Sequence, residues 1–127
     1  MILEHVLLPV KPGREAEFET AFAGARGIIS ATPGFRGLTL SRCVERPGVY
    51  LLLIQWDRLE DHTEGFRGSS RYERWRELLH HFYDPFPVVE HFQEVLAADP
   101  ADPDQPLVAP SEPGEARRGC GSAPSGT

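Results

Sequence analysis

The stretch Val49-Tyr50-Leu51-Leu52-Leu53-Ile54 decides the fold, because it is a β-rich run in which every residue is apolar or aromatic. A strand in a sheet with helices on one face and water on the other alternates between apolar and polar residues. This run does not alternate, so both faces of its strand are predicted to be buried. The turn sequence Arg46-Pro47-Gly48 precedes it and predicts a hairpin with an earlier strand over residues 35–45.

The first strand and the first helix precede this hairpin. Residues 2–10 form a short aliphatic run that a turn at Pro12 and Gly13 closes, which is typical of a strand. Between that strand and the hairpin, apolar residues recur at spacings of three and four, which predicts an amphipathic helix. Its apolar face consists of Phe18, Phe22, Ala25 and Ile29.

The region after the hairpin predicts a short helix. Asp57 is placed to cap its beginning, and Leu59, His62 and Phe66 share one of its faces.

A longer helix and a last strand complete the domain. Ser70 and Glu73 have the spacing of a capping box, which marks the beginning of the helix. Asp84-Pro85 ends the helix, because the residue before a proline is driven out of the helical region, and residues 86–95 form the last strand. The apolar stripe of the helix is Tyr72, Trp75, Leu79 and Phe82.

The order strand, helix, two strands, helices, strand predicts an α+β fold of the ferredoxin-like split β-α-β type, with a four-stranded antiparallel sheet and helices on one face. In the first strand, Leu3 and Leu7 lie on one face and Val6 and Leu8 on the other. The second face of the sheet is therefore predicted to be covered by an identical sheet in a homodimer. A monomer with one very apolar central strand is the alternative.

Composition changes abruptly at Ala97. Residues 1–96 are predicted to form the folded domain, and residues 97–127 to be a disordered tail rich in Pro, Gly, Ser and Asp. A segment with so few large apolar side chains cannot offset the entropy cost of ordering its backbone.

Composition also limits the partners and the compartment. The 127 residues carry a formal charge of −6, with no basic cluster, which disfavours nucleic acids and anionic membranes as partners. The sequence contains neither an apolar run long enough to span a membrane nor a basic leader, so a soluble cytoplasmic protein is expected. Cys43 and Cys120 have neither a disulfide framework nor metal-ligand spacing.

Several residue groups in residues 1–96 resemble one known family, the antibiotic biosynthesis monooxygenase (ABM) domain of the dimeric α+β barrel superfamily. Residues 70–92 are similar to one unassigned bacterial subgroup of it. The other residues that carry the likeness are Pro33-Gly34-Phe35, the run from Tyr50 to Trp56 with Asp57 and His62 after it, and Gly65-Phe66-Arg67-Gly68-Ser69.

The resemblance implies a homodimer whose two sheets form a barrel, with an apolar pocket in each protomer. Characterised oxygenases of the family oxidise anthrone-like molecules with O₂ and without metal or flavin, whereas other members of the superfamily degrade haem or have no known reaction. The expected function is a cofactor-independent monooxygenase acting on a small phenolic, anthrone-type or quinone-type aromatic. A non-catalytic dimeric module that binds a ligand or a partner is the alternative.

His62 and Trp56 are the candidate catalytic residues. A deprotonated phenol can itself give an electron to O₂, so the site needs a base, hydrogen-bond donors and a dry pocket. A half-buried imidazole at His62 would titrate near neutral pH, and the Trp56 indole N–H could donate to a substrate. The alternatives are a helix histidine bonded to a carbonyl and a core tryptophan. Anthrone oxygenases have an asparagine where this chain has Leu52.

The candidate pocket wall is aromatic. Core packing explains most of this stripe, and a pocket wall is its second expected role. The candidate substrate-binding residues are Leu52, Phe66, Tyr72, Trp75 and Phe82.

The spacing of the histidines does not predict a metal site. His80 and His81 are adjacent on a helix and point about 100° apart, so solvent or helix-end roles are expected. His62 and Glu64 point about 200° apart, which argues against a shared iron ion. The haem-degrading branch carries a histidine where this chain has Arg76.

His5 and His91 lie on strands that are neighbours in the predicted sheet. A cross-strand polar pair is expected, or a pocket-lining pair if both side chains face the interior.

Overall fold

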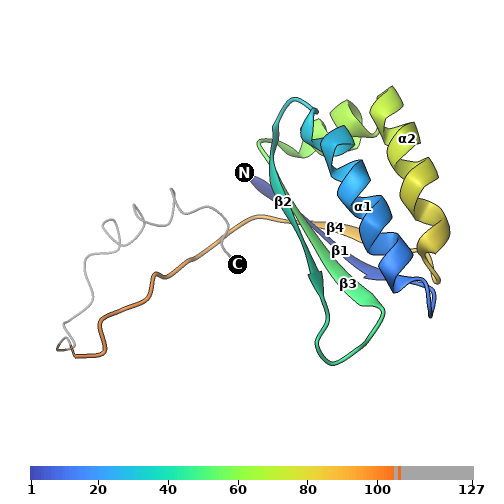
Figure 1. Ribbon diagram of the computed structural model, residues 1–127. Coiled ribbons are helices and arrows are strands. Elements are labelled where there is room, and N and C mark those ends of the chain that lie inside the picture. The colour runs from blue at the N-terminus through green and yellow to red at the C-terminus, as the bar shows by residue number, and fades with distance from the viewer. Residues whose placement is uncertain (105, 107–127) are drawn as a thin grey trace. The chain divides into compact units, whose positions relative to one another are not determined.

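The computed structural model describes residues 1–104 and 106, and it has the predicted four-stranded antiparallel α+β architecture (Figure 1). The α-helices are α1 (Glu15–Ser30) and α2 (Ser70–Leu79), accompanied by a π-helix, η1 (Asp61–Phe66), and a 3₁₀ turn, η2 (His80–Phe82). The strands are β1 (Ile2–Pro9), β2 (Phe35–Arg42), β3 (Val49–Trp56) and β4 (Val89–Phe92).

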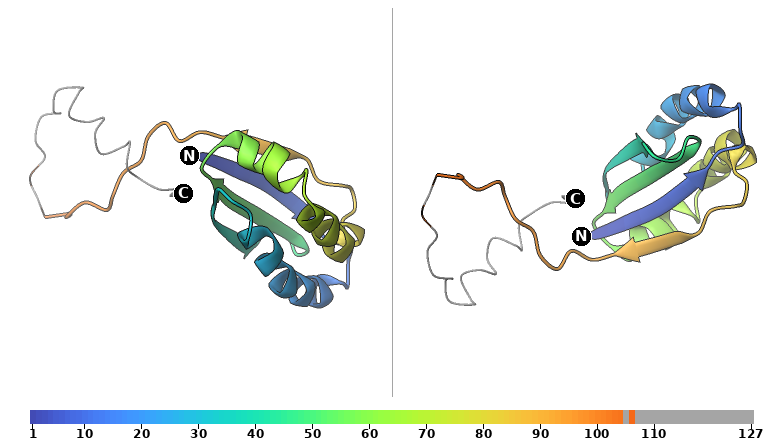
Figure 2. Two further views of the ribbon diagram at one scale, coloured as in Figure 1. Left: turned by 90° about the horizontal axis from the view of Figure 1, so that it is seen from above. Right: turned by 90° about the horizontal axis from the view of Figure 1, so that it is seen from below.

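The sheet has the order β2-β3-β1-β4, and both helices pack on one of its faces (Figure 2). The register places Glu4 opposite Ile54 of β3 and opposite His91 of β4. Because side chains alternate along a strand, the even-numbered residues of β1 and β3 face the helices together. This register sets the composition of the site described below.

The core lies between the sheet and the helices. The four apolar residues predicted for the first helix are all buried in α1, which confirms that stripe. On β3 the even-numbered residues Tyr50, Leu52, Ile54 and Trp56 are buried against the helices. Tyr50 and Trp56 pack against aromatic rings of neighbouring elements, namely Phe18 and Phe35.

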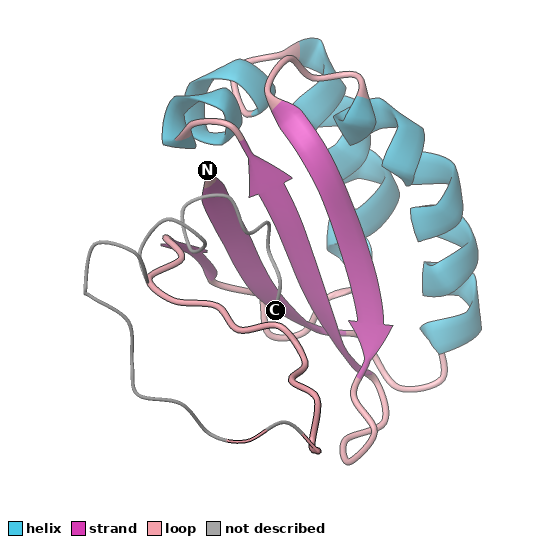
Figure 3. Ribbon diagram, turned by 90° about the vertical axis from the view of Figure 1, so that its left-hand side faces the viewer, coloured by secondary structure: helices cyan, strands magenta, loops and turns pink. Residues whose placement is uncertain are grey.

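None of the described helices covers the opposite face of the sheet (Figure 3). Leu7 is 43% exposed and Phe92 is 48% exposed on this face, and the odd-numbered residues of β3 point the same way. The sequence prediction of a two-sided apolar β3 is therefore correct for the strand, and its second face is open in the single chain.

Several predicted boundaries differ from the structure. The strand predicted over residues 35–45 ends at Arg42, and the helix predicted to end at Asp84-Pro85 ends at Leu79, where η2 follows. The last strand is only Val89–Phe92, because the segment from Asp84 to Val88 forms the connection from η2. The capping box at Ser70 does not form: Ser69 is the N-cap residue, and its Oγ donates to the carbonyl of Phe66.

The Asp57 cap is also absent. The side chain of Asp57 pairs with Arg36, while the carboxylate of Asp61 accepts a hydrogen bond from the backbone N–H of Arg58 at 3.0 Å. The π-helix runs from Asp61 to Phe66, and the backbone N–H of Arg67 bonds to the carbonyl of His62 at 3.1 Å.

Residues from Glu94 onward form a second unit of the chain, apart from Met1–Gln93. Its described residues contain no helix or strand. Most of the predicted tail, residues 105 and 107–127, lies outside the described part of the chain. None of the described helices is long and apolar enough to cross a membrane.

Gly34 fixes the position of the π-helix against the sheet. Its φ of +88° favours glycine, and its carbonyl accepts the backbone N–H of Asp57 at 2.8 Å. A Cβ at this position would collide with the side chain of Asp61, the first residue of η1. The turn thus lets the segment that carries His62 approach the beginning of β2.

Gly34→Ala is expected to destabilise the protein by about 1–3 kcal/mol, because it combines an unfavourable φ with a steric collision. Gly27→Ala is the matched control: it lies inside α1 with open space around its Cβ position, so it should stabilise by up to about 1 kcal/mol. Urea unfolding of both variants measures the effect. Equal effects of the two substitutions would contradict the close packing at Gly34.

Candidate active site

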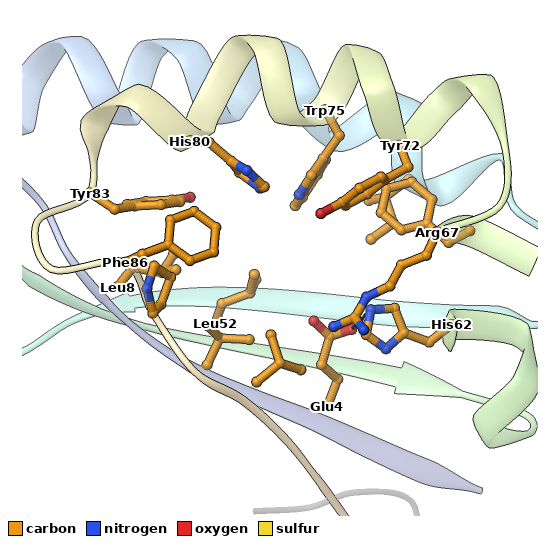
Figure 4. Close-up of a pocket in the computed structure, with 15 residues that line it drawn as sticks. Glu4, Leu8, Leu52, His62, Arg67, Tyr72, Trp75, His80, Tyr83 and Phe86 are labelled. Atoms are coloured by element: carbon orange, nitrogen blue, oxygen red, sulfur yellow. Dashed lines mark ion pairs between the residues drawn. The ribbon is translucent and has the colours of Figure 1, made fainter. Parts of the chain in front are cut away.

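A cavity of about 90 Å³ lies between the helix-facing side of the sheet and α2 (Figure 4). Its floor comes from β1 and β3, one end from η1, and its roof from α2 and the segment after it. The residues around it are Glu4, Val6, Leu8, Ile29, Leu52, His62, Phe66, Arg67, Tyr72, Trp75, His80, Tyr83, Phe86, Pro87 and Val89.

Glu4 is the only carboxylate among the residues that line this cavity, and it is 5% exposed. The indole N–H of Trp56 donates to its Oε1 at 3.0 Å, and Nε2 of His62 lies 3.4 Å from the same oxygen. Both contacts are to Oε1, which leaves Oε2 for a ligand. Burial raises the pKa of Glu4 to about 7, against the lowering effects of the Trp56 hydrogen bond and the Arg67 charge.

His62 is held on three sides. It stacks on Trp56 with ring centroids 5.4 Å apart and planes at 19°, and its Nδ1 lies 2.8 Å from Nε2 of His91. Burial, followed by the charges of Arg67 and His91, lowers the pKa of His62 to about 3. His62 is therefore neutral near pH 7, and the group with a near-neutral pKa is Glu4.

Hydrogen-bonding side chains also point into the cavity from the roof. Figure 4 shows four of them on the side of the cavity opposite Glu4. The hydroxyls of Tyr72 and Tyr83, the indole nitrogen of Trp75 and the ring of His80 are directed into the cavity. Burial raises the pKa of Tyr83, so its hydroxyl stays protonated. The cavity thus has an acid–base group on its floor and hydrogen-bond donors on its roof.

A carboxyl group with a pKa near neutrality in an apolar cavity is suited to proton transfer, because both of its protonation states are populated at the working pH. Arg67 lies beside Glu4 and His62 in Figure 4, where its charge favours the ionised carboxylate. The arrangement can take a proton from a bound hydroxyl and stabilise the anion that forms.

Most of the predicted site residues lie together in the structure. His62, Leu52, Phe66, Tyr72 and Trp75 all line the cavity. Their roles toward a substrate remain predictions.

Two predicted site residues lie elsewhere. Trp56 is fully buried behind Glu4, and its N–H is used by that carboxyl instead of facing a substrate. Phe82 packs against Phe18 in the core and does not line the cavity.

The remaining histidines lie in different surroundings. His80 is the C-cap residue of α2, one of the two roles expected for it, and it also lines the cavity, whereas His81 is exposed. His5 faces the open side of the sheet and contacts Phe92, while His91 faces the helices. His5 and His91 are therefore not a cross-strand pair. Among the residues that the structure describes, no group of three or more His, Cys, Asp or Glu is placed to hold a metal ion.

Glu4 is the important residue that the sequence prediction missed. A period of two places it on the same face as Val6 and Leu8, so a carboxylate in phase with the buried residues of β1 was the available indication. For His80 the indication was its spacing of eight from Tyr72, two helical turns away.

Comparison with known proteins agrees with this fold. The family model for antibiotic biosynthesis monooxygenase matches residues 1–78. The chain belongs to the antibiotic biosynthesis monooxygenase family. It is also 56% identical over 95 residues to YczJ of Bacillus subtilis, an uncharacterized protein, and the match covers 75% of this chain and all of YczJ.

Solved structures of the family have the same fold. A Bordetella bronchiseptica protein described as an antibiotic biosynthesis monooxygenase is 37% identical, with a TM-score of 0.72 over 75% of this chain and 97% of that one. At 21% identity, the ActVA-Orf6 monooxygenase of Streptomyces coelicolor, solved with nanaomycin D, shares the fold with a TM-score of 0.68 over 79% and 92%. SnoaB of Streptomyces nogalater, a cofactor-independent oxygenase, shares it at 19% identity, a TM-score of 0.66 and coverage of 76% and 94%.

Replacing Glu4 by Gln is expected to change how stability depends on pH. The raised pKa means that the folded state holds the Glu4 proton more tightly than the unfolded chain does. The resulting stabilisation is complete below pH 4.5 and is lost as the pH rises through about 7. The free energy of unfolding of the wild type, minus that of Glu4→Gln, should therefore fall by up to about 1.4 kcal/mol per pH unit across this range.

Urea unfolding at a series of pH values measures this difference. Glu77→Gln removes an exposed carboxylate of α2 outside the cavity and is the control against which Glu4→Gln is compared. A flat difference for Glu4→Gln would show that the buried carboxyl has an ordinary pKa.

Proposed function

We propose that this protein is a monooxygenase that oxidises a small, single-ring phenol or hydroquinone with O₂, without a metal or an organic cofactor. The observation that carries the proposal is the buried Glu4 carboxyl, with a pKa of about 7, in a cavity lined by aromatic side chains. Membership of the antibiotic biosynthesis monooxygenase family supports the reaction class.

Glu4 acts as the base in this reaction. The substrate O–H bond breaks and its proton moves to Oε2 of Glu4, while Oε1 stays bonded to Trp56. The electron-rich phenolate gives one electron to O₂, and the two radicals combine to form a C–O bond at a ring carbon ortho to the oxygen, which carries a hydrogen. Glu4 returns its proton to the peroxide anion. Loss of water from the resulting hydroperoxide breaks the O–O bond and removes the ring hydrogen, so phenol and O₂ become an ortho-quinone and water with no outside reductant.

The polar groups on the floor and on the roof of the cavity favour a ring with two oxygen atoms. A hydroxyl would donate to Glu4 on the floor, while Tyr72 and Trp75 on the roof would donate to a second oxygen (Figure 4). Donors placed where negative charge develops stabilise a transition state. A para-oxygenated ring meets both requirements.

The size of the cavity favours one ring over three. An apolar cavity of about 150 Å³ holds benzene, whereas this one has about 90 Å³. Phe86 lines it and is 61% exposed, so a movement of this side chain would widen the cavity toward the size of one ring. Leu52, in place of the asparagine of anthrone oxygenases, also argues against an anthrone.

We also propose that the open sheet face binds a second copy of the chain. Leu7, Leu51, Leu53 and Phe92 make this face apolar, and an isologous contact would bury it.

Oxygen uptake tests the proposed reaction. The wild-type protein should consume O₂ with a single-ring hydroquinone or para-substituted phenol, faster than with anthrone, and kcat/KM should rise with pH through about 7 as Glu4 ionises. Glu4→Gln should lower kcat by about 10²–10⁴-fold, while Glu77→Gln should leave it unchanged. If no member of the panel consumes O₂ faster than buffer, yet these aromatics raise the melting temperature, the protein is a binding module instead.

Sedimentation equilibrium at micromolar concentration tests the dimer. Leu7→Glu places a charge on the open sheet face and should convert a dimer to a monomer. Leu78→Glu is the matched control, because Leu78 on α2 is 40% exposed and Leu7 is 43% exposed. A monomeric wild-type protein, or equal effects of the two variants, would contradict the dimer.

A further inference from the structure

Three titratable side chains from three different elements form a row of contacts that begins at the cavity. Oε1 of Glu4 on β1 lies 3.4 Å from Nε2 of His62 on η1, and Nδ1 of His62 lies 2.8 Å from Nε2 of His91 on β4. Each imidazole therefore contacts its neighbours through nitrogen atoms, and His62 uses both of its nitrogens. The cross-strand pairing of Glu4 with His91 keeps the two ends of this line in fixed register.

Only two proton arrangements satisfy this line while both rings are neutral, because a neutral imidazole carries one N–H and one bare nitrogen. When Glu4 is ionised, Nε2–H of His62 points to the carboxylate and Nε2–H of His91 donates to Nδ1 of His62. When Glu4 is protonated on Oε1, it donates to Nε2 of His62, whose Nδ1–H donates to Nε2 of His91. The two arrangements differ by one proton.

We propose that His62 and His91 form a proton wire that connects the carboxyl of Glu4 to solvent, and that each proton carried reverses the tautomer of both rings. The role of the wire rests on the proposed function, in which Glu4 is the base. The wire adds a route by which the proton of Glu4 can leave the site. His91 is a positioning residue in this scheme, because it acts on the substrate only through His62 and Glu4.

Export of a proton runs through three linked transfers. The Oε1–H bond of Glu4 breaks as Nε2–H of His62 forms, then Nδ1–H of His62 breaks as Nε2–H of His91 forms. Nδ1–H of His91 finally breaks, and its proton passes to water. No electrons are exchanged, and Glu4 is left as the carboxylate that accepts the substrate proton.

Burial makes such a route necessary. Glu4 is 5% exposed and His62 3%, whereas His91 is only partly buried at the edge strand of the sheet. Near pH 7 about half of the Glu4 carboxyls carry a proton, in keeping with a pKa of about 7. A substrate that fills the cavity would block direct exchange with water, so a protonated Glu4 could become a base only through the histidines.

The surrounding charges keep both rings neutral during this transfer. Arg67 next to η1 adds to burial in lowering the pKa of His62 and of His91. The other titratable groups around the cavity, Tyr72, His80 and Tyr83, lie on its roof, away from Glu4 (Figure 4). Titration of Glu4 is therefore expected to change the tautomers of His62 and His91 without protonating either ring to an imidazolium.

Nitrogen NMR of the full-length protein with ¹⁵N-labelled histidine tests the wire without substrate or turnover. From pH 8 to pH 6 the bare nitrogen of His62 should change from Nδ1 to Nε2, and that of His91 from Nδ1 to Nε2, with a shared midpoint near pH 7. Glu4→Gln should abolish both changes. Glu90→Gln, which removes a carboxylate from the opposite face of β4, should leave them intact.

His91→Gln tests conduction, because glutamine can hydrogen-bond to His62 but cannot relay a proton. At the midpoint pH the wild-type His62 should give one averaged signal, and this averaging should be lost in the variant. Unchanged tautomers between pH 8 and pH 6, an imidazolium at either ring, or equally fast exchange in His91→Gln would each overturn the wire. Because the measurement needs no substrate, its result is separate from that of the oxygen-uptake assay.

Discussion

The burial of one carboxyl group on a central strand is the constraint on which this site depends. Glu4 lies in the row of β1 side chains that otherwise builds the core, and an isolated buried charge costs several kcal/mol. The fold reduces this cost by placing the indole N–H of Trp56 at 3.0 Å and His62 beside the same oxygen. The remaining cost is expressed as a raised pKa, which gives the group its chemical use.

The elements around Glu4 are arranged so that its contacts cannot easily be lost. Trp56 and His91 come from the two strands that flank β1, so the sheet register itself aligns them. His62 comes from the π-helix, which the turn at Gly34 allows to pack against the sheet. The pairing of the strands therefore also fixes the geometry of the site. The roof, by contrast, is built from α2 and the segment after it.

The sequence predicted the architecture because its main indications are local. The stripe of Phe18, Phe22, Ala25 and Ile29, the unbroken apolar run of β3 and the proline-glycine turns each depend on neighbouring residues only. The site was predicted in part: His62 and four wall residues line the cavity, whereas the titrating group is Glu4. The pKa of a side chain depends on strand register and burial, which periodicity does not supply. The π-helix was also missed: it begins at Asp61, whose side chain lies close to Gly34, and periodicity does not supply such a contact between distant segments.

A buried base with its own route to solvent accounts for how a small α+β domain could activate an aromatic hydroxyl using only side chains. The claim at its centre is that Glu4 changes protonation near neutral pH. Carbon NMR of the protein labelled with ¹³C at the glutamate side-chain carboxyl, assigned by comparison with Glu4→Gln, measures this directly. The account predicts one carboxyl that titrates with a midpoint near 7, and a midpoint near the ordinary value of 4.5 for Glu4 would contradict it.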